Sequence, residues 1–303
     1  MQFELADHQG DLLDAVSTLL DRFAGPARCR QLGGASPRYD SELEEALGSA
    51  GFLDIASDPD GGPLDATLVG EAVAAAAGVL SYGASALVAP GIGVSGLTGP
   101  VAMTTASHRG PVRFAADART LLVHEGERVR VVDVDPDRFD RVPSRFGYPF
   151  GDVTEIPDGG TVLDAGSGVR MLAWWRLALA VEAVGTMIAA LALTVDHTRE
   201  RKQFGRAIGS FQAVQHRLAE LKVLSEGARW LVLETAWRGA PDDAAAIALT
   251  HTLSAARRVP ADTHQLTGAL GFASEYDLHL WTMRLPALSI EAGWLNRSVG
   301  TAR

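Results

Sequence analysis

Apolar residues recur at helical spacing in two parts of the chain, near its beginning and over its last third. The most apolar stretch, residues 171–198, is rich in Ala and Leu and is too long for a strand. Residues 211–239 follow with apolar positions three and four apart, and Pro241 begins a further helical stretch that runs to about residue 265. Because the connections are short, these helices should be antiparallel neighbours, and we predict a C-terminal four-helix bundle.

The N-terminal and central parts of the chain differ in pattern. Three helices are predicted before residue 82, over residues 11–23, 39–53 and 64–80. Gly and Pro then become frequent, and short β-type runs occupy residues 112–115, 120–123 and 129–134, with turns at 96–100 and 142–151. The pattern predicts a mainly α protein with a small central β domain, divided into residues 1–82, 83–165 and 166–303.

Composition and charge exclude several classes of protein. The 303 residues carry a net charge of −10, with a pI near 5.3, which disfavours a general nucleic-acid binder. The single cysteine, Cys29, excludes an internal disulfide and a multi-cysteine metal site, so we expect no metal. The N-terminus lacks the residue order of a signal peptide, and the charge-free run 183–195 is too short to span a bilayer. We expect a soluble, cytoplasmic protein.

A basic turn lies between the first two helices of the predicted bundle. It contains two glycines and Phe204, together with the cations Arg199, Arg201, Lys202 and Arg206. Cations beside glycine backbone suit an anionic ligand such as a pyrophosphate, whereas charge alone favours a solvated turn. Ser210 precedes the second helix and is a candidate N-cap.

The order of residues in this turn resembles a motif of the acyl-CoA dehydrogenases, R-x-x-F-G followed by F-Q and H-x-L-A. The matching positions are Arg201, Phe204, Gly205, Phe211, Gln212, His216, Leu218 and Ala219. In that family the motif joins two helices of the C-terminal domain and reaches the FAD of a neighbouring subunit. The resemblance therefore implies that this turn contacts FAD.

A second segment, residues 264–281, is similar to the Q-x-x-G-G-x-G-[FY]-x-x-E motif of the same family. The matches are Gln265, Gly268, Gly271, Phe272 and Glu275, while Ala269 replaces a usual glycine. The family's backbone there lies near the adenosine and pyrophosphate of FAD, although a Gly-rich turn between helices would also explain the segment alone. The run from Glu275 to Leu280 further resembles a steroid and bulky acyl-CoA branch found in actinobacteria.

The chain departs from the family at the catalytic base, a glutamate in one of two positions. The first position falls on Trp175, whose indole cannot abstract a proton, and the second falls on Gly293. Glu291, two residues earlier, is the one candidate base. Glu182 is expected to pair with a cation or to face a polar seam. The family's T-E-P-x-x-G-S-D and W-x-[ST] motifs, which hold the flavin ring and acyl-CoA, have no counterpart in residues 83–165 beyond Thr104 and Thr105.

The resemblance thus implies a shortened acyl-CoA dehydrogenase subunit that pairs with a longer catalytic subunit, as in the α2β2 heterotetramers of steroid side-chain degradation. The residues expected to contact the shared FAD are Arg201, Gln203, Phe204, Gln212, Gln265, Gly268 and Gly271. The partner would supply the base, and the complex would convert an acyl-CoA to its α,β-enoyl-CoA. Two alternatives remain open: a self-sufficient homo-oligomeric enzyme that uses Glu291, and a non-enzymatic homologue that stabilises a partner.

Overall fold

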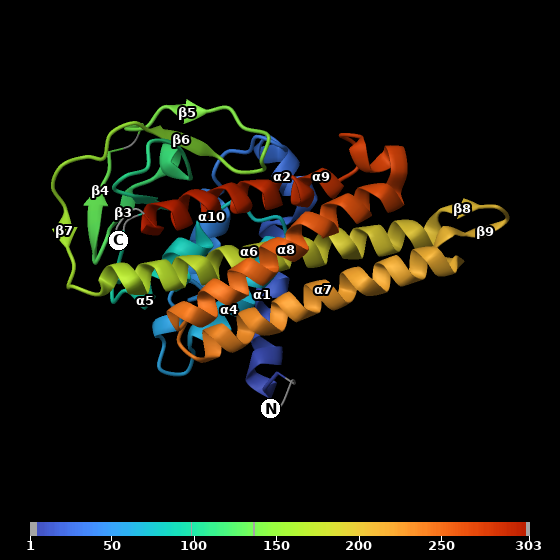
Figure 1. Ribbon diagram of the computed structural model, residues 1–303, viewed down its shortest axis with the longest axis horizontal. Helices are drawn as coiled ribbons and strands as arrows, with labels where there is room; N and C mark the ends of the chain where they lie inside the picture. The colour runs from blue at the N-terminus through green and yellow to red at the C-terminus, as the bar shows by residue number, and fades with distance from the viewer. Residues whose placement is uncertain (1–4, 98, 136, 301–303) are drawn as a thin grey trace.

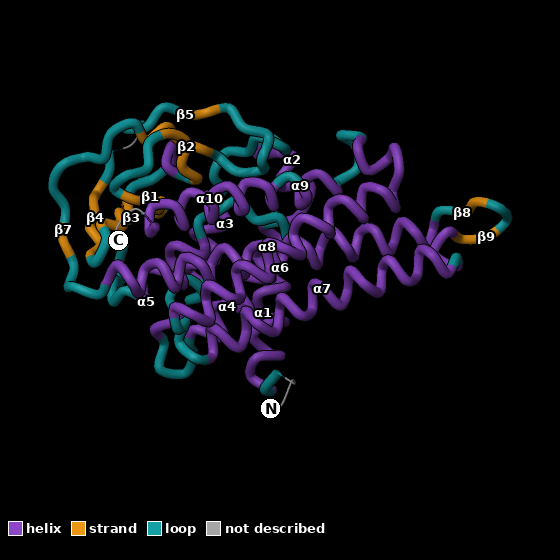
Figure 2. Tube along the Cα trace, in the orientation of Figure 1, coloured by secondary structure: helices purple, strands orange, loops and turns teal. Residues whose placement is uncertain are grey.

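A computed structural model describes residues 5–97, 99–135 and 137–300 of the chain, with side chains to residue 297. Helices form most of the molecule, and most of the strands gather at one end of the helical part (Figures 1 and 2). The predicted fold class, mainly α with a small β region, is confirmed.

The N-terminal part is helical, as the periodicity predicted. Its helices are α1 (Asp7–Phe23), α2 (Gly25–Leu32), α3 (Ser41–Ser49), α4 (Pro63–Ala75), a π-helical turn (Ala84–Val88) and α5 (Ala89–Gly91). The side chain of Asp40 accepts a hydrogen bond from the Leu43 backbone and so caps α3, while Arg28 pairs with the same carboxylate. Pro63 occupies the first turn of α4, where a backbone N–H would have no partner within the helix, so the missing N–H costs no hydrogen bond.

Two small sheets make up the β region. The first has the order β1-β3-β4-β7, with β1 (Val101–Thr105) parallel to β3 (Thr120–Glu125), and β4 (Arg128–Asp133) and β7 (Thr161–Val162) added antiparallel. The second has the antiparallel order β2-β6-β5, from β2 (Gly110–Arg113), β6 (Phe150–Val153) and β5 (Arg141–Val142). The strand predicted at 112–115 ends early because Phe114 has φ +65°.

The turn predicted over residues 142–151 is wrong in part, because β5 ends and β6 begins within it. Val142 pairs with Phe150 across the intervening loop. These strands have two and four residues, which is too short for a local periodicity to indicate them. Their pairing within the sheet specifies them instead.

The C-terminal part is a bundle built around α6 (Ser167–Glu200). Around α6 lie α7 (Gln212–Trp237), α8 (Asp242–Thr267), α9 (Leu278–Thr282) and α10 (Arg284–Gly300), with a 3₁₀ turn, η5 (Gly268–Phe272), after α8. α6 is long and apolar enough to cross a membrane by composition, but 67% of its most apolar window is buried inside the protein. The helix therefore has the burial of a core helix. Ser210 does not cap α7, since its hydroxyl donates to the Ala207 carbonyl and Phe211 is the N-cap residue.

One hydrophobic core unites these parts. Its buried members run from Val16 in α1, through Val101 and Leu122 in the first sheet and Trp175 in α6, to Leu295 in α10. A smaller cluster lies within the β region.

Candidate functional site

The basic turn folds as a two-residue hairpin that projects from the end of α6. It joins β8 (Lys202–Gln203) to β9 (Arg206–Ala207), and both turn residues, Phe204 (φ +51°) and Gly205 (φ +78°), have left-handed backbone. Such turns favour Asn-Gly, and an L-residue with a Cβ at positive φ costs about 1–2 kcal/mol. The Phe204 side chain is nevertheless 92% exposed. It contributes little to this chain's own core.

Side chains around the hairpin face outward. The side chains of Arg201, Gln203 and Gln212 are exposed, and the Arg206 guanidinium lies 4.0 Å from the centre of the Phe211 ring. Among residues 5–97, 99–135 and 137–297, no carboxylate forms an ion pair with Arg201 or Arg206. The surface therefore offers donors and an aromatic ring without a local anionic partner.

A groove lies at the C-terminal end of α8. Its volume is about 370 Å³, and its lining residues are Pro260, Ala261, His264, Gln265, Gly268 and Phe272. Gly268 ends the helix with φ +61° and ψ −143°, a conformation available essentially to glycine, and Phe272 is 77% exposed. Gly271, by contrast, is buried, and a Cβ there would lie 2.1 Å from the Thr267 hydroxyl. Its lack of a side chain is thus required by packing within the chain.

His264 belongs to this groove, although no sequence motif singled it out. Its Nε2 lies 2.9 Å from the Thr282 hydroxyl, and its Nδ1 is buried without a hydrogen bond of normal geometry to any described residue. Burial lowers the pKa of His264, which favours the neutral ring. The sequence shows that His264 lies one helical turn before Gly268, and this spacing alone could have indicated that it lines the groove.

The hairpin and the groove lie at the same end of the bundle (Figure 1). Exposed cations, amides and an aromatic ring fit a ligand with phosphate and adenine groups, such as the FAD that the resemblance implies. Whether the predicted residues contact FAD stays a prediction.

Trp175, the first position considered for a base, meets the candidate base Glu291 inside the molecule. The fully buried indole of Trp175 donates a 2.7 Å hydrogen bond to Glu291 Oε1, and Glu291 is itself only 6% exposed. Arg113, from β2, donates to both Glu291 oxygens, at 2.5 and 3.3 Å, and to Glu182 at 2.9 Å. The prediction that Glu182 pairs with a cation is confirmed. Gly293, the other position, carries no side chain.

Arg113 stays charged in this setting. Burial disfavours the charge, but Glu182 and Glu291 outweigh it and raise the pKa of Arg113 well above its usual value. Its guanidinium also lies 4.7 Å from the centre of the Tyr148 ring. Arg113 was not predicted as part of a site, because a single Arg within a short strand gives no local sign of its partners.

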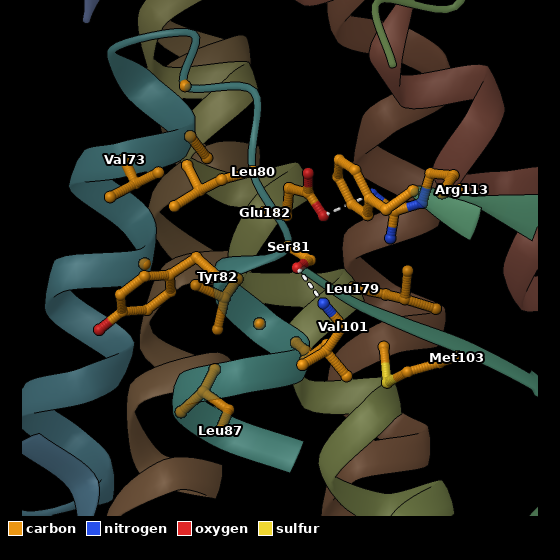
Figure 3. Close-up of a pocket in the computed structure, with 18 of the residues that line it drawn as sticks. Val73, Leu80, Ser81, Tyr82, Leu87, Val101, Met103, Arg113, Leu179 and Glu182 are labelled. Atoms are coloured by element: carbon orange, nitrogen blue, oxygen red, sulfur yellow. Dashed lines mark hydrogen bonds and ion pairs between the residues drawn. The ribbon is translucent and has the colours of Figure 1, made fainter. Parts of the chain in front are cut away.

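A pocket lies in the interior beside this ion pair (Figure 3). A cavity of about 40 Å³ remains between α4, α6 and β1, lined by apolar side chains such as Leu80, Leu87 and Leu179. That space is enough for only a few water molecules. The exposed groups that suit a phosphate-bearing cofactor lie instead on the outer surface, at the hairpin and the α8 groove.

Comparisons with known proteins agree with this architecture. Residues 167–298 match the family model described as acyl-CoA dehydrogenase, C-terminal domain. The chain is 28% identical to the acyl-CoA dehydrogenase IpdE2 of Mycobacterium tuberculosis, over 90% of this chain and 89% of that protein. Residues 167–298 thus form a C-terminal domain of the acyl-CoA dehydrogenase family, and the likeness to a dehydrogenase of that family extends over most of the chain.

Two solved structures show the likeness of fold. A variant of the steroid acyl-CoA dehydrogenase Tcur3481-Tcur3483 superposes with a TM-score of 0.82 at 21% identity, covering 97% of each chain. The ChsE4-ChsE5 complex from Mycobacterium tuberculosis gives 0.79 at 22% identity, covering 99% of this chain and 98% of that one. The family resemblance drawn from the motifs is thereby confirmed.

Proposed function

We propose that this chain is a subunit of an FAD-dependent acyl-CoA dehydrogenase that forms α,β-enoyl-CoA together with a longer, catalytic partner subunit. The hairpin carries the proposal. Phe204 is held in an unfavourable backbone conformation and is almost fully exposed, which makes sense if its contacts lie on another molecule. We infer that this molecule is the partner with its FAD.

The bound flavin would accept the β-hydrogen of the acyl group as hydride. This chain would supply binding groups only. Arg201 and Gln203 would donate hydrogen bonds to the cofactor from the hairpin, while Gln265 and the Gly268 backbone would meet it at the α8 groove. The partner would supply the base, because the Glu291 carboxylate is already engaged by Arg113 and Trp175.

Partner and substrate follow from the relatives. One similar structure is a complex of two proteins, ChsE4 and ChsE5, and another is described as a steroid acyl-CoA dehydrogenase. We therefore propose a heteromeric assembly in the cytoplasm acting on a bulky acyl-CoA, with a steroid side chain as the first substrate to test.

The test is the visible spectrum of the chain purified alone and with an acyl-CoA dehydrogenase encoded beside it. The lone chain should be colourless, and the complex should absorb at about 450 nm, where oxidised flavin absorbs. Stoichiometric flavin on the lone chain, bleached by an acyl-CoA, would instead favour the self-sufficient enzyme.

Arg201→Ala tests the contribution of the hairpin. Losing one charge-assisted hydrogen bond should weaken FAD binding by the complex roughly 10- to 100-fold, measured by flavin retention on dilution. Arg238→Ala at the opposite end of α7 is the matched control, because that side chain is half-exposed and forms an ion pair with Glu234 far from the hairpin. Unchanged flavin retention in Arg201→Ala would point to the partner-stabilising alternative.

A further inference from the structure

Arg113 joins three segments that are far apart in the sequence. It lies on β2, its partner Glu182 is on α6, and its partner Glu291 is on α10. We call these three residues the Arg113 cluster. Figure 3 shows Arg113 and Glu182 joined by their ion pair at the edge of the central cavity. The cluster thus ties the β region to two helices of the bundle.

Two further contacts hold the cluster in place. The Tyr148 ring, from the loop before β6, lies between the guanidinium groups of Arg113 and Arg284, 4.7 and 5.0 Å from its centre. Arg284 is fully buried and donates to the carbonyls of Ala77 and Gly78. The two arginines and two glutamates balance in charge, which reduces the cost of burying them.

The cluster also separates two spaces. On its inner side lies the cavity of about 40 Å³, and on its outer side lies a surface cleft of about 370 Å³ lined by rings of His108, Phe146, Phe150 and Trp294. Arg113 and Glu291 line both spaces. Behind them, the Trp175 ring packs edge-on against Trp294 at 5.4 Å. A ligand entering from the surface would meet a closed wall before it reached the apolar interior.

We propose that the Arg113 cluster takes the place of a bound ligand between the β region and the helical bundle. Side chains of the chain itself hold the two parts together, so the fold does not depend on flavin or acyl-CoA in this cleft. This stability claim concerns the lone chain and is independent of the proposed function. The consequence for the complex rests on the proposed function: FAD and acyl-CoA bind only at the outer surface of this chain and in the partner subunit.

Thermal unfolding of the lone chain tests the cluster. Arg113→Met and Glu291→Gln should each lower the Tm by about 5–10 °C, since each removes the buried ion pair between Arg113 and Glu291. Glu182→Gln should cost less, because Glu182 is 22% exposed. Arg141→Met is the control: it removes an ion pair with Asp117 from the same region, but Arg141 is 44% exposed and the Tm should stay within about 2 °C.

Two further measurements cover the case in which single variants do not fold. The triple variant R113M/E182L/E291M removes every charge of the cluster and should regain part of the lost Tm, the rest of the loss reflecting the Trp175 indole N–H left without its acceptor. FAD and octanoyl-CoA should leave the Tm of the unmodified lone chain unchanged. A ligand-induced rise of more than about 3 °C would overturn the proposal. So would single variants that behave like the control, or a Glu291→Gln complex that loses turnover at unchanged Tm.

The outcomes separate the two proposals. A colourless complex would refute the shared flavin site, while the lone-chain Tm values would still decide whether the Arg113 cluster replaces a ligand.

Discussion

His124 is a buried side chain whose surroundings favour its neutral form. It lies on β3, is 6% exposed, and its Nε2 has no hydrogen-bond partner within the described part of the chain. Burial, and then the charge of Arg176, lowers its pKa below the usual 6.5. The unfolded chain therefore binds protons more readily than the folded chain below pH 6.5. Folding stability should fall as the pH falls through this range.

His124→Phe should make this loss of stability smaller. The expected result is a reduced difference in unfolding free energy between about pH 7 and pH 5, measured by urea titration. Some pH dependence should remain, because His108 and His264 also have lowered pKa values. An identical pH dependence in the variant and the unmodified chain would contradict the assignment to His124.

At this scale, single residues could be predicted from the sequence better than their contacts. Trp175 and Glu291 were identified at or near the two base positions, but not as hydrogen-bonded to each other. Arg113 was not predicted at all. Contacts across 116 and 178 residues depend on how three elements pack, which no local pattern encodes. Motif matching selected Gly271 for a ligand, whereas the structure gives that glycine a packing role.

At the scale of elements, the fit of α6 against α4 depends on a glycine. A Cβ at Gly185 would lie 2.2 Å from the Glu71 carbonyl oxygen and 2.9 Å from the Ala74 Cβ. Gly185→Ala should therefore destabilise the fold by about 1–3 kcal/mol, measured by urea unfolding. Gly10, within α1, has nothing within 4 Å of a Cβ, so Gly10→Ala should stabilise by about 0.5–1 kcal/mol. Equal effects in both variants would refute this packing.

Element length explains which elements could be predicted. The helices α6, α7 and α8 have 34, 26 and 26 residues, long enough for apolar periodicity alone to indicate them. The strands β5, β8 and β9 have two residues each and exist only through their pairing partners. The hairpin tip was also unexpected, because Phe rarely occupies a left-handed turn position.

At the scale of the whole molecule, α6 connects the parts. It packs against α4, the first sheet, α7, α8 and α10, and the main core includes side chains from the N-terminal helices, the first sheet and the bundle. The hairpin projects from the end of α6 away from the sheets (Figure 1). A partner that binds the hairpin would therefore meet a surface whose loss leaves the core intact.

A shared core predicts that the lone chain unfolds as one unit, even though its sequence pattern divides it into residues 1–82, 83–165 and 166–303. Separating any part would expose apolar surface on the others, because α6 contacts all three. Helix content in the far ultraviolet and tryptophan fluorescence should therefore be lost at the same urea concentration. Trp174, Trp175 and Trp294 report on the core in this measurement. Two resolved transitions would mean that the β region unfolds separately and that the Arg113 cluster does not hold it to the bundle.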